Sequence, residues 1–370
     1  MYGTVTDPSL RVLGAPREYI QGPGALDQLP RLAARHGNGH VAAIIDGFLY
    51  DTLAPRLETL FSLAGQQVTC LRFGGEATRQ EGDRLVAAAA DAAVVAGIGG
   101  GKGIDIGKYV ALQTGKAVFS LPTVASNDAP TSRLIVLYNE DHAVVGTEHL
   151  RYNPDLVLVD TDIIASAPPR LLRAGVGDAL TKLYEARAAA ASGGVNSFTA
   201  SPPFLGRKLG AICLDVIQRT AVPVLAALTE GQRHADFEEL VETLILLSGI
   251  AFESGGLSVA HSMVRGLTRL PELSGYLHGE QVAYSTLVQL VLEGSGELDG
   301  ALAFNRAIGL PVSLSRMGIA PNDLERAASI IGEATMTAPY ITNFPRQLDA
   351  AAIAGAVIEL ERASAIAKGA

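Results

Sequence analysis

Residues 92–105 read AAVVAGIGGGKGID, and this stretch decides the fold. The compact apolar run over 92–98 is the pattern of a strand buried on both faces, and it leads directly into three consecutive glycines. A helical pattern follows, with Ile104, Lys108 and Ala111 on one face. Glycines between a strand and a helix let backbone N–H groups approach a phosphate, because no Cβ intervenes.

The usual phosphate-binding signatures do not fit these glycines. The G-x-G-x-x-G fingerprint would need glycine at the position of Lys102. The P-loop pattern would need glycine at Ala96 and a hydroxyl residue at Gly103. Two interpretations therefore stay open, a dinucleotide site of another type and a tight turn without a ligand.

Strand and helix patterns alternate around this stretch in the first half of the chain. Further apolar runs predict strands at 41–45, 67–73, 117–121 and 156–159, and helical patterns lie at 49–64 and 80–90. This alternation indicates a parallel, doubly wound sheet. Asp46 directly follows the first run. A carboxylate there can bind an adenine ribose and repel the extra phosphate of NADP, or it can simply initiate a turn before Gly47.

The pattern changes after about residue 160, where strand signals nearly vanish. Long helical patterns cover 170–191, 205–228, 238–252 and 281–292. We therefore predict an α/β nucleotide-binding domain over 1–160 and an all-helical domain over 161–370. The cleft between two such domains is the expected active site.

Composition excludes several classes of protein. The 370 residues are 48% hydrophobic and 18% charged, which is a globular composition. The net charge of -9 argues against nucleic acid as a partner. We find no secretory pattern at the start and no apolar run of the ~18 to 20 residues that a membrane span needs. Two cysteines far apart in the sequence, Cys70 and Cys213, fit a reducing compartment. We expect a soluble, cytoplasmic protein.

Two histidines and one aspartate stand out in the second half because their surroundings are apolar. His261 lies in an apolar helical pattern after a glycine pair, and His278 directly precedes another. Asp178 enters an otherwise apolar helix, where an unpaired carboxylate would be costly. A lone histidine on such a helix is more often a core residue than a ligand. Together, one carboxylate and two imidazoles make a three-ligand site for Zn²⁺ or Fe²⁺.

The motifs around these residues resemble the glycerol dehydrogenases, within the superfamily of iron-type alcohol dehydrogenases and dehydroquinate synthase. The similar segments follow the family's order, at 19–22, 73–76, 97–102, 122–132, 153–155, 177–180, 247–257 and 278–283. The resemblance implies a dehydroquinate synthase-like fold, with an α/β domain followed by an all-α domain. It also implies a homo-oligomer, often a ring-like octamer, and the NAD-linked oxidation of a small polyol or vicinal diol such as glycerol.

The resemblance also implies roles for individual residues. The ligands of a catalytic zinc ion would be Asp178, His261 and His278. The cofactor NAD would be bound by Asp46, Gly99, Gly100, Gly101, Lys102, Asp105, Thr123, Ser126 and Ser132. Asp128 would lie near the substrate, or it would cap a helix that begins at Ala129-Pro130. The zinc ion would act as a Lewis acid toward the alcohol oxygen while hydride leaves for NAD.

Several positions depart from the family's pattern. Lys182 stands where the iron-type branch usually has a fourth ligand, a histidine, which favours zinc over iron. Val264 and Arg265 replace a His-Asn pair that usually follows the first metal histidine. Ser274, Gly275 and Thr342 stand where further histidines are typical. The substrate pocket is therefore altered around an intact set of metal ligands.

Two other activities stay open. A hydroxycarboxylate dehydrogenase of the same fold would need a cation in its pocket, and Arg265 is the candidate. A cyclase-lyase similar to dehydroquinate synthase would need several basic residues for a substrate phosphate, and 261–278 offers only Arg265 and Arg269. A binding protein without catalysis is disfavoured because all three metal ligands are present.

Overall fold

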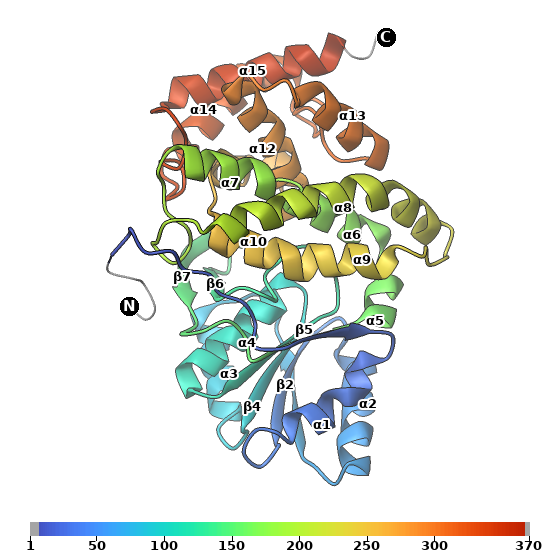
Figure 1. Ribbon diagram of the computed structural model, residues 1–370. Coiled ribbons are helices and arrows are strands. Elements are labelled where there is room, and N and C mark those ends of the chain that lie inside the picture. Colours follow the sequence, from blue (N-terminus) through green and yellow to red (C-terminus); the bar gives the residue numbers. More distant parts are fainter. Residues whose placement is uncertain (1–6, 367–370) are drawn as a thin grey trace. The chain divides into compact units, whose positions relative to one another are not determined.

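The computed structural model describes residues 7–366 and divides into two compact units (Figure 1). The first comprises residues 14–168, and the second comprises residues 7–13 and 169–366. Helix α5 (Thr161–Ser166) lies beyond the predicted boundary at 160 but belongs to the first unit. It does so because it packs against strands β1 and β8 of that unit.

The first unit is built on a six-stranded parallel sheet with the order β1-β8-β5-β4-β2-β3. Its strands are β1 (Tyr19–Gly22), β2 (Val41–Asp46), β3 (Val68–Phe73), β4 (Val94–Gly99), β5 (Ala117–Pro122) and β8 (Leu156–Asp160). A separate antiparallel pair consists of β6 (Leu134–Tyr138) and β7 (Val144–His149). The helices are α1 (Leu29–Ala33), α2 (Tyr50–Leu63), α3 (Arg79–Ala88), α4 (Gly101–Thr114) and α5, with a 3₁₀ helix at Ala25–Gln28.

Alternate residues of the central strands contribute side chains to two hydrophobic cores, one on each face of the sheet. Along β2, Val41, Ala43 and Ile45 pack with α1 and α2, whereas Ala42 and Ile44 pack with α3 and α4. Every one of these side chains is buried, so the strand reads as a continuous apolar run. The sheet is therefore doubly wound, as the sequence predicts.

Glycines bring strand β4 and helix α4 into close contact. A Cβ placed on Gly107 would lie 2.6 Å from the Cα of Gly97, which is closer than any side chain allows. A Cβ on Gly97 would in turn lie 3.0 Å from the carbonyl oxygen of Gly103. The glycines at 97 and 107 are thus required by packing, and they let α4 lie directly against the strand that precedes it.

The described part of the second unit is helical, apart from an isolated bridge between Arg11 and Ser201. Its α-helices are α6 (Pro169–Ala179), α7 (Lys182–Ala191), α8 (Phe204–Thr229), α9 (Phe237–Glu242), α10 (Ser248–Gly255), α11 (Val259–Leu267), α12 (His278–Glu293), α13 (Leu298–Ile308), α14 (Leu324–Thr335) and α15 (Ala350–Ile366). Short 3₁₀ helices lie at Pro271–Leu273 and Pro321–Asp323.

Two of the predicted long helices are interrupted. The pattern over 170–191 forms α6 and α7, which are separated by a turn at Leu180 and Thr181. The pattern over 238–252 contains a π-helical turn, Thr243–Leu247, between α9 and α10. Apolar residues continue through both interruptions, so hydrophobicity alone does not reveal them.

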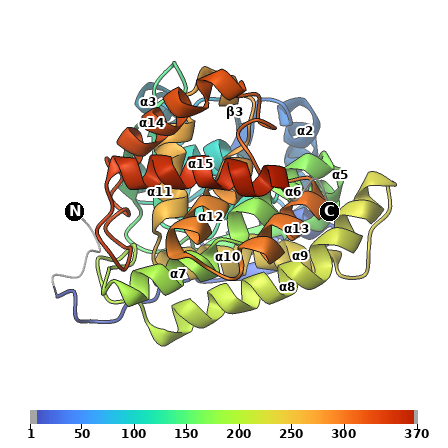
Figure 2. The same cartoon turned by 90° about the horizontal axis from the view of Figure 1, so that it is seen from above.

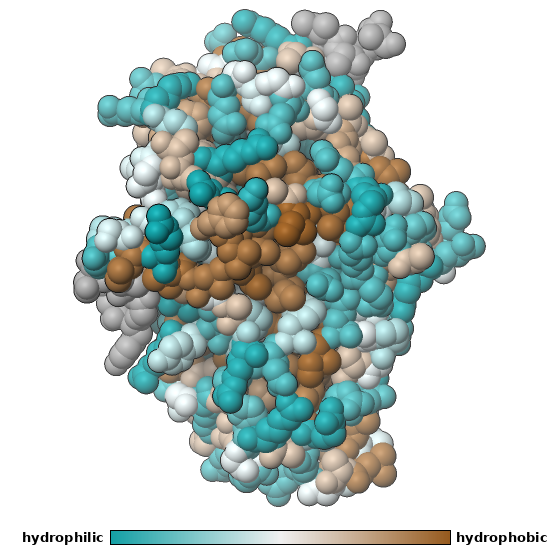
Figure 3. Space-filling model, viewed as in Figure 1, coloured by the Kyte–Doolittle hydropathy of each residue, from teal (hydrophilic) through white to brown (hydrophobic). Residues whose placement is uncertain are grey.

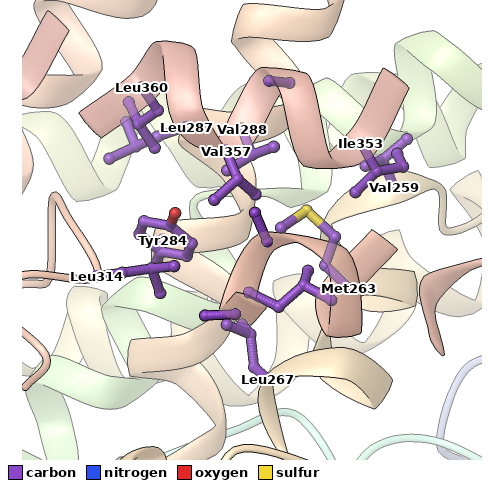
Figure 4. Packing of buried hydrophobic residues seen from close by; sticks show 14 of the residues in the cluster. Val259, Met263, Leu267, Tyr284, Leu287, Val288, Leu314, Ile353, Val357 and Leu360 are labelled. Atoms are coloured by element: carbon purple, nitrogen blue, oxygen red, sulfur yellow. The ribbon is translucent and has the colours of Figure 1, made fainter. Parts of the chain in front are cut away.

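One hydrophobic core holds the helices that carry the two candidate metal histidines. It joins Met263 and Leu267 of α11 to Leu287 and Val288 of α12 and to Val357 of α15 (Figure 4). Figure 2 shows α11, α12 and α15 from above. His261 lies on α11 and His278 begins α12, so this core fixes the helices from which both imidazoles project.

Helix α8 runs along the surface of the second unit (Figures 1 and 2). Apolar side chains gather over it in Figure 3, and those exposed on α8 are Phe204, Leu205, Ile212 and Val222. By length and composition alone α8 could cross a membrane, which corrects the expectation that no segment could. One such helix is weak evidence, since core helices of soluble proteins pass the same test. Exposed Lys208, Asp215 and Arg219 also interrupt its apolar surface.

Candidate metal and nucleotide sites

The three predicted metal ligands converge within the helical unit. Asp178 lies near the end of α6, His261 in the first turn of α11 and His278 at the start of α12. One candidate ligand atom from each side chain lies within 4.8 Å of the other two. Asp178 Oδ1 is 3.2 Å from His261 Nε2 and 3.9 Å from His278 Nε2. One carboxylate oxygen and two imidazole nitrogens at this spacing fit the donor set of a catalytic zinc site.

Glycines next to two of these ligands bring α6 and α12 together. A Cβ on Gly279 would lie 1.8 Å from the carbonyl oxygen of Ala174, and one on Gly177 would lie 2.4 Å from the carbonyl oxygen of Gly279. The two helix backbones therefore touch at this point. This contact explains why Gly177 precedes Asp178 and why Gly279 follows His278, since each glycine allows the neighbouring ligand to approach the other.

Glu185 of α7 orients His261. Its buried carboxylate accepts hydrogen bonds from His261 Nδ1 at 2.6 Å and from the backbone N–H groups of Ser258 and His261 at 2.8 and 2.9 Å. Nδ1 therefore carries a proton, and Nε2 faces Asp178. Burial by itself would raise the pKa of Glu185, but His261 and Lys182 hold it below its usual value. Sequence reasoning missed this residue.

Lys182 brings a positive charge into the same cluster. Its side chain is wholly buried, and Nζ donates to Asp178 Oδ1 at 2.9 Å and lies 3.4 Å from His261 Nε2. Burial by itself would raise the pKa of Asp178, but Lys182 and the two histidines hold that pKa well below its usual range. Asp178 is therefore an ionised carboxylate inside the helical unit.

The candidate nucleotide site lies in the first unit, where β4 meets α4. Gly100 caps α4, and no side chain caps the N–H groups of the first helical turn. The loop after β5 lies alongside, because the Thr123 N–H donates to the Gly99 carbonyl at 3.0 Å. A Cβ on Gly100 would meet only Val124, at 3.4 Å, so packing within the unit does not by itself require glycine there. The uncapped N–H groups of the first turn fit a bound phosphate.

Asp46 ends β2 beside this glycine loop. A Cβ on Gly99 would lie 3.0 Å from the Cβ of Asp46 and 3.5 Å from its Oδ2. Asp46 Oδ1 accepts a hydrogen bond from the Phe48 N–H at 3.0 Å. The side chain therefore initiates a turn and also sets a carboxylate next to the glycines, so the two interpretations from sequence are compatible.

Lys102 and Asp105 make contacts inside the first unit. Lys102 Nζ donates to Glu76 Oε2 at 2.6 Å. The buried Asp105 carboxylate accepts from Lys108 Nζ at 3.2 Å and from the Val136 N–H at 3.1 Å. Burial raises the pKa of Asp105 although Lys108 opposes the shift. Asp105 thus ties α4 to β6.

The segment after β5 holds the other predicted residues. Asp128 is buried, and its carbonyl accepts a turn hydrogen bond from the Thr131 N–H at 3.2 Å. No helix begins at Ala129, because residues 129–131 form a turn that leads toward β6. The alternative of a helix cap at Asp128 is therefore wrong. Ser126 accepts from Asn127 Nδ2 at 3.5 Å, and the Ser132 hydroxyl lies 3.4 Å from the Ala129 carbonyl.

Arg265, the predicted pocket cation, donates from Nη1 to the Thr337 carbonyl at 3.0 Å and is exposed. The cation that contacts the candidate ligands is Lys182 instead.

Comparison with known proteins identifies the family to which the chain belongs. A model of the iron-containing alcohol dehydrogenase family matches residues 20–168. The chain is 36% identical over 312 residues to the glycolaldehyde reductase of Halobacterium salinarum, covering 83% of this chain and 85% of that one. It is 36% identical over 332 residues to the glycerol dehydrogenase of Escherichia coli O6:H1, covering 88% and 89%. The solved structure of a probable glycerol dehydrogenase from Sinorhizobium meliloti superposes with a TM-score of 0.90 at 35% identity, covering 96% and 99%.

Proposed function

Since the chain belongs to the iron-containing alcohol dehydrogenase family, among the glycerol dehydrogenases, we propose that it oxidises a small polyol or vicinal diol with NAD and zinc. The observation that carries the proposal is the cluster of Asp178, His261 and His278, in which Glu185 directs His261 Nε2 toward the other ligands. The relatives' names support the substrate class, because glycerol and glycolaldehyde both carry oxygens on adjacent carbons.

The helical unit would hold the metal. Asp178, His261 and His278 would bind the ion, which supplies Lewis acidity toward the alcohol oxygen. One carboxylate with two imidazoles suits zinc, and Lys182 stands where the iron-type branch usually has a fourth ligand. Glu185 would keep the His261 ring in place and its Nδ1 protonated.

The α/β unit would hold NAD, the hydride acceptor. Gly99, Gly100 and Gly101 would surround the pyrophosphate, with the first-turn N–H groups of α4 as donors. Asp46 would face the adenosine ribose. Thr123, Ser126 and Ser132 would lie along the cofactor, and Asp128 would lie near the substrate. The contacts of Lys102 with Glu76 and of Asp105 with Lys108 support structural roles for those two side chains.

We also propose a soluble, cytoplasmic homo-oligomer. The glycerol dehydrogenase resemblance implies an assembly, often an octamer, and the exposed apolar side chains of α8 are its candidate interface. The exposed charges of α8 support contact with protein and water rather than with lipid.

Substitution of the ligands tests the proposal. We expect Asp178→Asn, His261→Ala and His278→Ala to lose bound zinc and turnover of glycerol and 1,2-propanediol together. NADH binding, followed by fluorescence, should persist because its residues belong to the other unit. His234→Ala, in the same unit but outside the cluster, is the control. A variant that loses its metal and keeps its turnover would contradict the proposed chemistry, and three variants that keep the metal would contradict the ligand assignment.

A further inference from the structure

The cluster contains one charged side chain, that of Lys182, which has no role in the proposed chemistry. Lys182 is wholly buried, and its ammonium touches the carboxylate oxygen that lies nearest both candidate histidines. We propose that Lys182 is an internal cation that competes with the divalent ion for Asp178 and thereby lowers the metal affinity of this chain. The inference rests on the proposed metal site and adds a determinant of its affinity.

Geometry places the ammonium at the edge of the ligand set. Nζ lies 2.9 Å from Asp178 Oδ1 and 3.4 Å from His261 Nε2, so it contacts two of the three candidate ligand atoms. The Phe252 ring centroid lies 5.6 Å from Nζ. Ammonium and metal ion would therefore lie within a few ångströms of each other on one carboxylate.

The backbone of Lys182 has little room to withdraw. Lys182 is four residues after Asp178 and begins α7. Helix α8 packs directly against this point, because a Cβ on Gly210 would lie 2.9 Å from the Lys182 carbonyl oxygen and 3.0 Å from the Leu183 backbone. Only movement of the side chain could take the ammonium away from Asp178.

Two like charges at this separation repel strongly when one of them, the Lys182 ammonium, is buried away from water. The nearby carboxylate of Glu185 already accepts hydrogen bonds from His261 Nδ1 and two backbone N–H groups. An ion must therefore either displace the ammonium from Asp178 or bind against its charge. In the metal-free protein the same ammonium neutralises Asp178, so it keeps the cluster assembled without metal.

The test compares zinc affinity in Lys182→Met and in the wild type. Methionine is of similar length and carries no charge. Competition against a fluorescent zinc chelator should show binding to Lys182→Met at least about tenfold tighter. The metal-free variant should melt at a lower temperature, because Asp178 loses its partner, and zinc should raise its melting temperature by more than in the wild type. Arg362→Met removes an exposed cation on α15 of the same unit, away from the cluster and from α8, and should change neither quantity.

A second variant covers the case in which Lys182→Met does not fold. Lys182→Gln keeps a hydrogen-bond donor for Asp178 without the charge, and it should also bind zinc more tightly. Affinity equal to or weaker than that of the wild type in the folded variants would overturn the inference.

Adding His278→Ala to each protein separates the inference from the proposed function. If the zinc affinity falls on removal of His278 but does not change on replacement of Lys182, only the proposed competition is overturned. If His278→Ala leaves the zinc affinity unchanged in every protein, the proposed metal site is overturned, and the inference with it.

Discussion

Nδ1 of His261 lies 2.6 Å from Oε2 of Glu185, a carboxylate that is wholly buried. The two residues come from different helices, α11 and α7, and the bond fixes the orientation of the imidazole ring. A histidine held in this way offers the same nitrogen to a metal in every molecule, which lowers the cost of assembling the site.

Glu185→Gln should weaken zinc binding by about tenfold or more, because the neutral amide polarises His261 less and holds its tautomer less firmly. Chelator competition measures the change. The control is Glu297→Gln, which alters an exposed glutamate paired with Arg187 at 2.6 Å, a contact worth little. Unchanged zinc affinity in Glu185→Gln would show that Glu185 only supports the fold.

Asp46→Asn should relax the choice of cofactor. The asparagine side chain can still accept the Phe48 N–H, so the turn after β2 should survive while the charge is lost. We expect the ratio of kcat/KM for NADP to that for NAD to rise about tenfold, because repulsion of the extra phosphate disappears. A wild-type enzyme that already uses both cofactors equally well would refute the role of Asp46.

Alanine substitutions at two glycines should distinguish an effect on nucleotide binding from an effect on folding. Gly100→Ala adds a Cβ that meets only Val124, at 3.4 Å, so it should leave the melting temperature nearly unchanged but weaken NADH binding. Gly107→Ala adds a Cβ 2.6 Å from the Cα of Gly97, so it should destabilise the protein by about 1–3 kcal/mol. Thermal unfolding and NADH fluorescence distinguish the two effects. Normal NADH binding by Gly100→Ala would contradict the assignment of the glycine loop to the cofactor site.

The thiol of Cys70 should react slowly at neutral pH. Burial, with a smaller contribution from the Glu58 carboxylate, raises its pKa to about 11. A raised pKa means that thiolate forms only at high pH, so its fraction at pH 8 is about a hundredfold smaller than in an unperturbed cysteine. Iodoacetamide labelling, mapped by peptide mass, should accelerate about tenfold per pH unit up to that pKa. Labelling of Cys70 at the rate of free cysteine at pH 8 would contradict this environment.

The sequence predicts the central strands well because they are buried on both faces. Runs such as 41–45 and 156–159 become β2 and β8 almost unchanged. The exposed strand β7, with the polar residues Thr147, Glu148 and His149, gives no such signal. The short strand β1, which among the described residues pairs only with β8, was likewise not predicted. The antiparallel strand β6 was also missed, although Ile135 and Leu137 are buried, whereas the half-buried edge strand β3 was predicted. Burial on both faces therefore makes a strand easy to predict, but it does not decide every case.

The candidate metal site was predictable only in part. Asp178, His261 and His278 could be chosen because polar groups in apolar helices need partners. Glu185 carries the same signal, since it lies in an alanine-rich helix and is buried, but its partner is 76 residues away in the sequence. In the sequence, Lys182 is notable only because it stands where the iron-type branch usually has a histidine. The three-dimensional arrangement shows that its ammonium lies beside Asp178.

The origin of the three ligands on separate helices has a consequence for chain entropy. Asp178 and His261 are 83 residues apart. An ion bound to both would close that length of chain into a ring, and in the unfolded polymer such closure costs conformational freedom that grows with the logarithm of the ring size. Because that closure lowers the entropy of the unfolded chain, a bound ion would stabilise the segment between its ligands, from α7 to α10, beyond the energy of its own contacts.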